Sequence, residues 1–220
     1  MSGFTKESTA FLAALAKNNT REWFGAHKDD YEAYIKHPAK VFSEDMRLAL
    51  EAMTGMDHRK KVFRIYRDIR FSKDKSPYNS HISMSFMPDT QNAAMPGWYM
   101  RLTADQLVLG TGVFAYDKAN LEHWRERIAG KDGAKFSKIL NGLTAKGLRL
   151  GKPDLKRVPA GFDKDHPRAD LLRFKGLTVW KDFSSPAPIL GSAAAQTCLP
   201  HFKTLKPVFD WMSTLANKGH

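Results

Sequence analysis

The stretch RIYRDIRFSKDKSPYNSH, residues 64–81, holds the residue types that could bind an anion or act on one. Its arginines can hold a phosphate or carboxylate through two parallel hydrogen bonds, which a lysine ammonium does less well. Asp68 could orient these guanidinium groups, while Tyr66 or His81 could donate to the anion or transfer a proton. This stretch therefore predicts anion binding, and whether a reaction follows is left open.

An alternation of apolar and polar residues predicts that this chemistry lies on one face of a sheet. In residues 63–72 the odd positions are apolar except for Arg67, and the even positions are polar. The run HISMSF, residues 81–86, resumes the alternation, and residues 98–116 predict two further strands joined at the turn TADQ. We expect an antiparallel meander of four strands with one packed face and one polar face.

The polar face and the loop after its first strand supply the predicted ligand-binding residues. Tyr99, Arg101 and Thr103 would join this face from the third strand, and Gly110 and Gly112 would let a ligand or another backbone approach the last one. The alternative is a solvated face whose ion pairs contribute little energy. The predicted set is Arg64, Tyr66, Asp68, Arg70, Lys73, Lys75, Tyr78, His81 and Arg101.

Two further segments have a functional and a structural interpretation. SKDKSPYNS, residues 72–80, could cradle an anion with Lys73 and Lys75, but it lacks the nucleotide-loop pattern, and a plain hairpin connection is favoured. FDKDHPRAD, residues 162–170, contains three aspartates and His166, which suits a helix cap next to Pro167 better than a metal site. An oxygen-ligand Mg²⁺ site stays an alternative there, although we expect no metal site.

Two single residues have the same ambiguity. His27 shares a helical stripe with Trp23 and Tyr31, so we interpret it as a packing histidine, with a site histidine as the alternative. Cys198 lies between apolar residues and has only His201 as a basic neighbour, which indicates a structural thiol.

The composition indicates which cellular compartment and which classes of binding partner to expect. The net charge is +12 from 35 basic and 23 acidic residues, which favours phosphorylated metabolites, nucleic acid or acidic headgroups. A single cysteine excludes an internal disulfide and indicates a reducing compartment. The N-terminus has no signal pattern, and its apolar run at residues 11–16 is too short to cross a bilayer. We therefore expect a cytoplasmic protein without a membrane segment.

Helical patterns flank the predicted strands on both sides. They predict a helix ending at Asn18, a second capped by Thr20 and a third from Pro38 towards Gly55. Further helices are expected at residues 119–128, around residues 136–143, and at residues 192–217 with interruptions at Pro200 and Pro207. The prediction is one α+β domain over residues 1–220, with a central antiparallel sheet of about four strands between N-terminal and C-terminal helices.

Three blocks of the chain resemble a known family. They are NNTREWF at residues 18–24, RIYRDIRFSKDKSPYNSH at residues 64–81 and GFDKDHPRADLLRFKGL at residues 161–177. In this order they are similar to the signature stretches of the domain of unknown function 2461 family, over essentially the whole chain. The resemblance implies one complete domain, and it implies no reaction, cofactor or catalytic residue.

Three classes of function follow from these observations. The first is binding of a small phosphorylated or carboxylated ligand, with or without a reaction, at the arginine-rich polar sheet face. The second is nucleic-acid binding, in which the basic segment contacts phosphates and Tyr66, Tyr78 or Tyr99 stack on bases. The third is a structural or protein-interaction module. We favour the first, because charge that alternates with apolar residues is focused on one face. The sequence identifies no cofactor and no oligomeric state.

Overall fold

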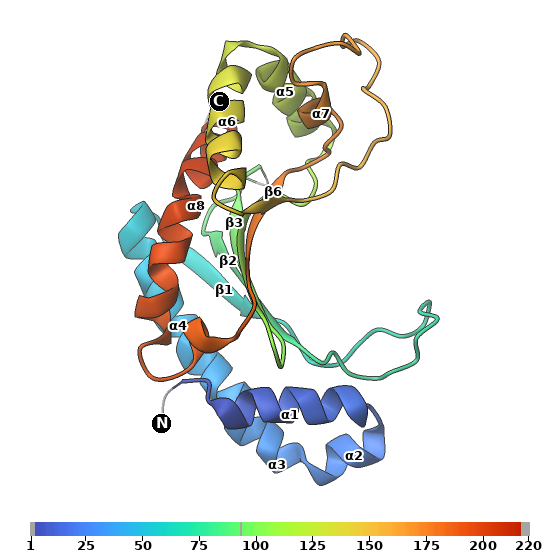
Figure 1. Ribbon diagram of the computed structural model, residues 1–220, viewed down its shortest axis with the longest axis vertical. Helices are drawn as coiled ribbons and strands as arrows, with labels where there is room; N and C mark the ends of the chain where they lie inside the picture. The colour runs from blue at the N-terminus through green and yellow to red at the C-terminus, as the bar shows by residue number, and fades with distance from the viewer. Residues whose placement is uncertain (1–2, 93, 217–220) are drawn as a thin grey trace. The chain divides into compact units, whose positions relative to one another are not determined.

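The computed structural model of the chain describes residues 3–92 and 94–216. A six-stranded antiparallel sheet has the strand order β1-β2-β3-β4-β6-β5 (Figure 1). Helices lie before and after these strands in the sequence, which confirms the predicted α+β class, with six strands where about four were expected. The strands are β1 (His58–Val62), β2 (Ile82–Pro88), β3 (Gly97–Leu102), β4 (Leu107–Gly112), β5 (Arg149–Leu150) and β6 (Thr178–Phe183).

The chain divides into two compact units, each built from several segments. Unit 1 comprises Met1–Phe86, Tyr99–Leu109 and Asp182–His201. Unit 2 comprises Met87–Trp98, Gly110–Lys181 and Phe202–His220. The expectation of a single domain over residues 1–220 stays a prediction.

The N-terminal helices of unit 1 begin and end at the residues that the sequence indicates. Thr20 caps α2, since its Oγ1 accepts the Trp23 N–H at 3.2 Å. Pro38 lies in the first turn of α4, and Gly55, with φ 72°, ends that helix in the left-handed conformation. The elements are α1 (Lys6–Lys17), α2 (Arg21–Ala26), α3 (Lys28–Tyr31), a π-helical turn (Glu32–Lys36) and α4 (His37–Thr54).

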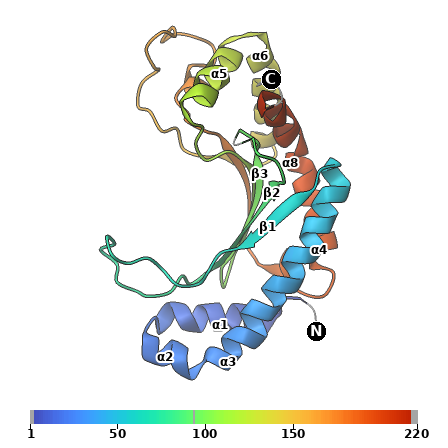
Figure 2. The same cartoon turned by 180° about the vertical axis from the view of Figure 1, so that it is seen from behind.

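Helix α4 packs along β1, the edge strand of the sheet (Figure 2). The Lys60 ammonium lies 2.6 Å from a Glu44 carboxylate oxygen, and the His58 N–H donates to Glu51 at 2.9 Å. Two polar contacts therefore help to fix the helix on the strand.

The first strand lies earlier in the chain than the alternation predicted. β1 ends at Val62, and residues 63–81 leave the sheet as a long hairpin loop that reaches away from β1 and β2 (Figure 1, Figure 2). Within this loop only the isolated bridge Tyr66–Tyr78 is strand-like. Local side chains compete for the backbone: Asp68 accepts the Arg70 N–H and Asp74 accepts the Ser76 N–H. Alternation therefore indicated an extended chain but not the strand pairing.

Unit 2 holds most of the C-terminal elements and its own aromatic core. Phe136 and Trp211 stack at 4.0 Å between ring centroids, and the Trp124 ring meets Phe136 edge-on at 5.8 Å. β6 pairs antiparallel with β5, with Arg149 opposite Trp180. The helices are α5 (Lys118–Ala129), α6 (Lys131–Thr144) and α7 (Ala169–Leu172).

The last helix, α8 (Ala194–Ala216), runs without a break through Pro200 and Pro207, so the expected interruptions are wrong. A proline inside a helix removes one hydrogen bond and costs about 3 kcal/mol. Burial of an apolar side chain contributes about 1.5–3 kcal/mol. Phe202, Val208, Phe209 and Met212 are all at most 1% exposed, so their burial outweighs that cost. A short 3₁₀ helix, Ala187–Ile189, precedes α8.

Among the described residues, no helix has the length and apolarity that a transmembrane segment needs.

Candidate functional site

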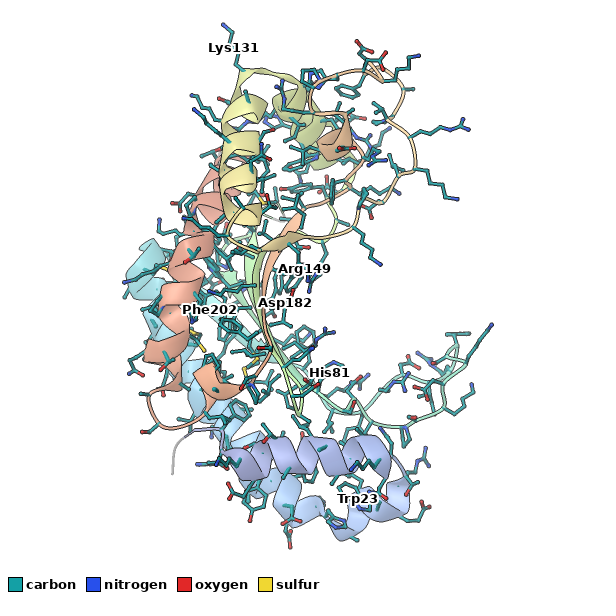
Figure 3. All side chains as sticks on the ribbon, in the orientation of Figure 1. Trp23, His81, Lys131, Arg149, Asp182 and Phe202 are labelled. Atoms are coloured by element: carbon teal, nitrogen blue, oxygen red, sulfur yellow. The ribbon has the colours of Figure 1, made fainter. Side chains whose placement is uncertain are left out.

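The predicted polar face exists on β2 and β3 of unit 1. Ile82, Met84 and Phe86 are buried on β2, and Met100 and Leu102 are buried on β3. Because strand side chains alternate between faces, the residues between them share the opposite face of two neighbouring strands. We call these residues the polar face: His81, Ser83, Ser85, Tyr99 and Arg101. Figure 3 shows His81 at the sheet, where the hairpin loop rejoins it.

The polar face carries a positive electrostatic field. The pKa of His81 is lowered, first by partial burial and then by the guanidinium groups of Arg101 and Arg67. Among the described residues, Arg101 has no ion-pair partner, and its side chain is exposed. Burial also raises the pKa of Tyr99 to about 12, so its phenol stays protonated. An anion that approached this face would meet one available guanidinium and several hydrogen-bond donors.

Arg67 belongs to this site, although the sequence placed it on the apolar side of a strand. Its guanidinium group donates to Asp74 Oδ2 at 2.5 Å, to the Ser76 carbonyl at 3.1 Å and to Ser72 Oγ at 3.3 Å. These bonds close the hairpin loop and hold the guanidinium where it acts on His81. Arg67 is the one polar residue at the odd positions of residues 63–72, and this exception was the signal in the sequence that could have identified it as a site residue.

Seven of the nine predicted site residues lie within the hairpin loop and not on the polar face of the sheet. Asp68 accepts two hydrogen bonds from the Arg70 guanidinium, at 3.0 and 2.7 Å, and both side chains are exposed. Lys75 donates to the Ile69 carbonyl at 3.1 Å. An exposed ion pair of this kind contributes little to stability, as the structural alternative stated. The seven are Arg64, Tyr66, Asp68, Arg70, Lys73, Lys75 and Tyr78.

Tyr66 and Tyr78 join an aromatic cluster that connects the hairpin loop to α2. The Phe24 ring stacks on Tyr78 at 4.1 Å and lies 6.0 Å from the Tyr66 ring. The Asn19 side chain holds the same point, since its amide accepts the Tyr78 N–H and donates to the Tyr78 carbonyl. Two of the three signature blocks therefore contact each other within unit 1.

The two glycines of β4 make room for the chain itself. A Cβ on Gly110 would lie 2.2 Å from Trp180 Cε3, and a Cβ on Gly112 would lie 2.1 Å from the Leu177 carbonyl oxygen. Gly112 has φ +131°, a conformation that other residues rarely adopt. The backbone of Leu177 approaches Gly112, and the Trp180 indole approaches Gly110. These two glycines therefore serve the packing of the chain and not the approach of a ligand.

The helix cap predicted next to Pro167 is wrong, because α7 begins at Ala169, its N-cap is Arg168, and no side chain caps it. His166 Nδ1 accepts the Arg168 N–H at 3.0 Å. The Arg168 guanidinium donates to the carbonyl oxygens of Ile128, Ala129 and Gly130, at 2.5 to 3.1 Å, and so satisfies the C-terminal end of α5. No group of three potential metal-ligating side chains occurs among the described residues, and the Arg168 contacts give this segment a structural role at the end of α5 instead of the predicted one.

The surroundings of His27 and Cys198 indicate a structural role for both side chains. The His27 ring stacks on Trp23 at 4.1 Å, and its Nδ1 lies 2.8 Å from the Trp23 carbonyl. Burial raises the pKa of the Cys198 thiol to about 12, and its Sγ lies 3.5 Å from the Pro188 carbonyl. A thiol of this kind is a poor nucleophile.

Comparison with known proteins agrees with the three blocks of the sequence. A search of curated proteins finds no match to this chain. A family model described as "Conserved hypothetical protein (DUF2461)" matches residues 7–211, which is nearly all of the 220 residues. The match includes the polar face, the hairpin loop and residues 162–170. The chain therefore belongs to the DUF2461 family.

Proposed function

We propose that unit 1 binds a small phosphorylated or carboxylated ligand on the polar face, with Arg101 and His81 as its main contacts. The observation that carries this proposal is the position of the exposed Arg101 side chain on the same sheet face as the half-buried His81, whose pKa is lowered first by burial and then by Arg101 and Arg67. Arg101 has no ion-pair partner among the described residues, so an anion would supply the missing negative charge. A guanidinium can hold either anion with two parallel hydrogen bonds.

The neighbouring donors suit the same ligand. Ser83 and Ser85 carry hydroxyl groups on this face, and the Tyr99 phenol is protonated at every physiological pH because its pKa is about 12. His81 would gain a proton when an anion binds next to it, since a negative charge favours the imidazolium. The ligand would then face a donor that can also act as a general acid, so a reaction at His81 is part of this proposal.

The loop residues of the predicted set would act on the ligand from a greater distance. Arg64, Arg70, Lys73 and Lys75 add positive charge to unit 1 and would attract an anion towards the polar face. A cytoplasmic location is also part of the proposal, and the single, buried cysteine supports it.

The test is isothermal titration with inorganic phosphate, pyrophosphate and citrate. We expect Arg101→Gln to weaken binding of at least one of these anions about 10- to 150-fold, the loss of roughly 1.5–3 kcal/mol of charged hydrogen bonds. The matched control is Arg157→Gln, which removes an exposed arginine in unit 2. Equal affinities of the two variants, or no binding by the unmodified protein, would refute the proposal.

The pH dependence gives a second readout. Because the pKa of His81 is lowered in the free protein and would rise when an anion binds, binding takes up a proton. Affinity should therefore increase as pH falls from about 8 to about 6, by up to about tenfold per pH unit. In the His81→Gln protein the anion should still contact Arg101, but its affinity should no longer increase as pH falls.

A further inference from the structure

We infer that residues 63–78 of the hairpin loop, which we call the hairpin arm, are a contact surface for single-stranded nucleic acid. This interaction is separate from the small-anion site on the polar face. The arm reaches away from β1 and β2 (Figure 1, Figure 2). Its exposed aromatic rings and the cations next to them are the two features that carry the inference.

The arm exposes aromatic rings along its length. Phe71 is 96% exposed, Tyr66 54% and Phe63 43%. A phenylalanine side chain contributes about 1.5–3 kcal/mol when it is buried, and here that contribution is forgone. Several exposed apolar side chains grouped on one segment mark a contact surface, whereas a single one would not.

Cations are interleaved with these rings. The Lys61 ammonium lies 5.0 Å from the centre of the Phe63 ring, and the Arg70 guanidinium carbon lies 5.9 Å from that of Phe71. The arm itself carries a net charge of +3, from five basic and two acidic side chains. Rings that stack on bases, next to cations that contact phosphates, are the features of a single-strand binding surface.

The arm is held in this shape before any ligand binds. Arg67 joins Asp74, Ser72 and the Ser76 carbonyl, and the Ser72 N–H donates to the Ile69 carbonyl at 3.3 Å to close the turn. Phe71 lies in this turn. The Phe71 ring is therefore exposed on a loop that hydrogen bonds already hold in place. Little further conformational entropy would be lost when a partner binds.

The distribution of the rings distinguishes nucleic acid from a lipid surface. A loop that inserts into a membrane needs several apolar side chains at its tip and a polar base. Here Phe71 lies at the turn with the half-buried Ile69, whereas Tyr66 and Phe63 lie further back on the arm. A single strand offers bases along its length, and their faces are available because they are not stacked in a duplex.

The test is fluorescence anisotropy with labelled RNA, single-stranded DNA and duplex DNA of about 20 nucleotides. Phe71→Ala should weaken binding of a single strand about 5- to 150-fold, because alanine removes one stacked base. The matched control is Phe114→Ala, since Phe114 is 60% exposed in unit 2. Phe71 makes no core contact, and circular dichroism of both variants would confirm that they fold.

The salt dependence tests the phosphate contacts. Four cations of the arm, Arg64, Arg70, Lys73 and Lys75, predict a slope of log affinity against log salt of about −3 for a single strand. The double variant Arg64→Gln/Lys73→Gln should make this slope less steep by about 1.4. The control is Lys131→Gln/Lys138→Gln, which removes the same charge from α6 and should leave the slope unchanged.

Three results would overturn the inference. The first is equal affinity of the Phe71→Ala and Phe114→Ala proteins for both single strands. The second is tighter binding of duplex than of either single strand. The third is binding to phosphatidylserine vesicles that needs Phe71, without binding to oligonucleotides. None of these results depends on Arg101, so the small-anion proposal is judged by its own titrations.

Discussion

Asn19→Ala tests how unit 1 holds the base of the hairpin arm. The Asn19 amide accepts the Tyr78 N–H at 3.0 Å and donates to the Tyr78 carbonyl at 2.9 Å. Across the bridge Tyr66–Tyr78, the ladder bonds are made by the neighbouring residues, so both backbone groups of Tyr78 point towards Asn19. One side chain therefore completes the pairing of a strand-like residue.

The magnitude follows from the loss of two hydrogen bonds at a residue that is only 6% exposed. Each lost bond costs between its net contribution of about 0.5–1.5 kcal/mol and the about 1–3 kcal/mol of a buried group left unsatisfied; at about 1–2 kcal/mol for each, the two bonds give about 2–4 kcal/mol in total. For a chain of this length the corresponding fall in Tm is about 4–16 °C. Asn19→Asp should lose about half as much, because a carboxylate can accept from the N–H but cannot donate to the carbonyl.

The assay is a thermal unfolding series together with amide hydrogen exchange at Tyr78. The neighbouring Asn18→Ala is the matched control, because the Asn18 amide donates to the Ala14 carbonyl in an exposed position. This control should cost less than about 1 kcal/mol and leave exchange at Tyr78 unchanged. If the two alanine variants have the same Tm and the same exchange rate, the bridging role assigned to Asn19 is wrong.

Four further outcomes are expected. Gly112→Ala should destabilise by more than about 2 kcal/mol in urea unfolding, because it combines φ +131° with a Cβ 2.1 Å from a carbonyl oxygen. Gly142→Ala, in α6 with open space around a new Cβ, should stabilise by about 0.5–1 kcal/mol in the same assay. Arg168→Met should cost about 2–4 kcal/mol, measured by urea unfolding, because three carbonyl groups at the end of α5 lose their donor. The pKa of Asp74 is lowered to about 2, by hydrogen bonds from Ser76 and then from Arg67, so its stabilising contribution is present above pH 3.8 and lost as pH falls through about 2. Amide hydrogen exchange in residues 63–78 should therefore become less protected as pH falls through about 2. Asp74→Asn should remove this acid-induced change, and its persistence would contradict the stabilising role of the Asp74 carboxylate.

Local signals in the sequence determined most helix boundaries and the buried face of the sheet. Thr20 as a cap, Pro38 in a first turn and Gly55 as a terminator each act within one turn of their own helix, so their effect can be predicted without the rest of the chain. The alternation in residues 81–86 also held, because burial of Ile82, Met84 and Phe86 is a property of one strand.

Strand pairing and the grouping of the site residues depended on tertiary structure. Residues 63–72 alternate like a strand, yet no strand of the sheet forms from them: residues 63–67 pair only with the returning side of the hairpin, and beyond them Asp68 accepts the Arg70 N–H. β6 was missed within a proline-punctuated stretch, although Thr178, Val179 and Trp180 are residue types that favour strands. Arg67 and Arg101, 34 positions apart in the sequence, act together on His81 only because the hairpin and β3 place them there. Sequence reveals residue type and local period, whereas the contacts between distant residues that make a charged cluster a site are fixed only when the chain packs.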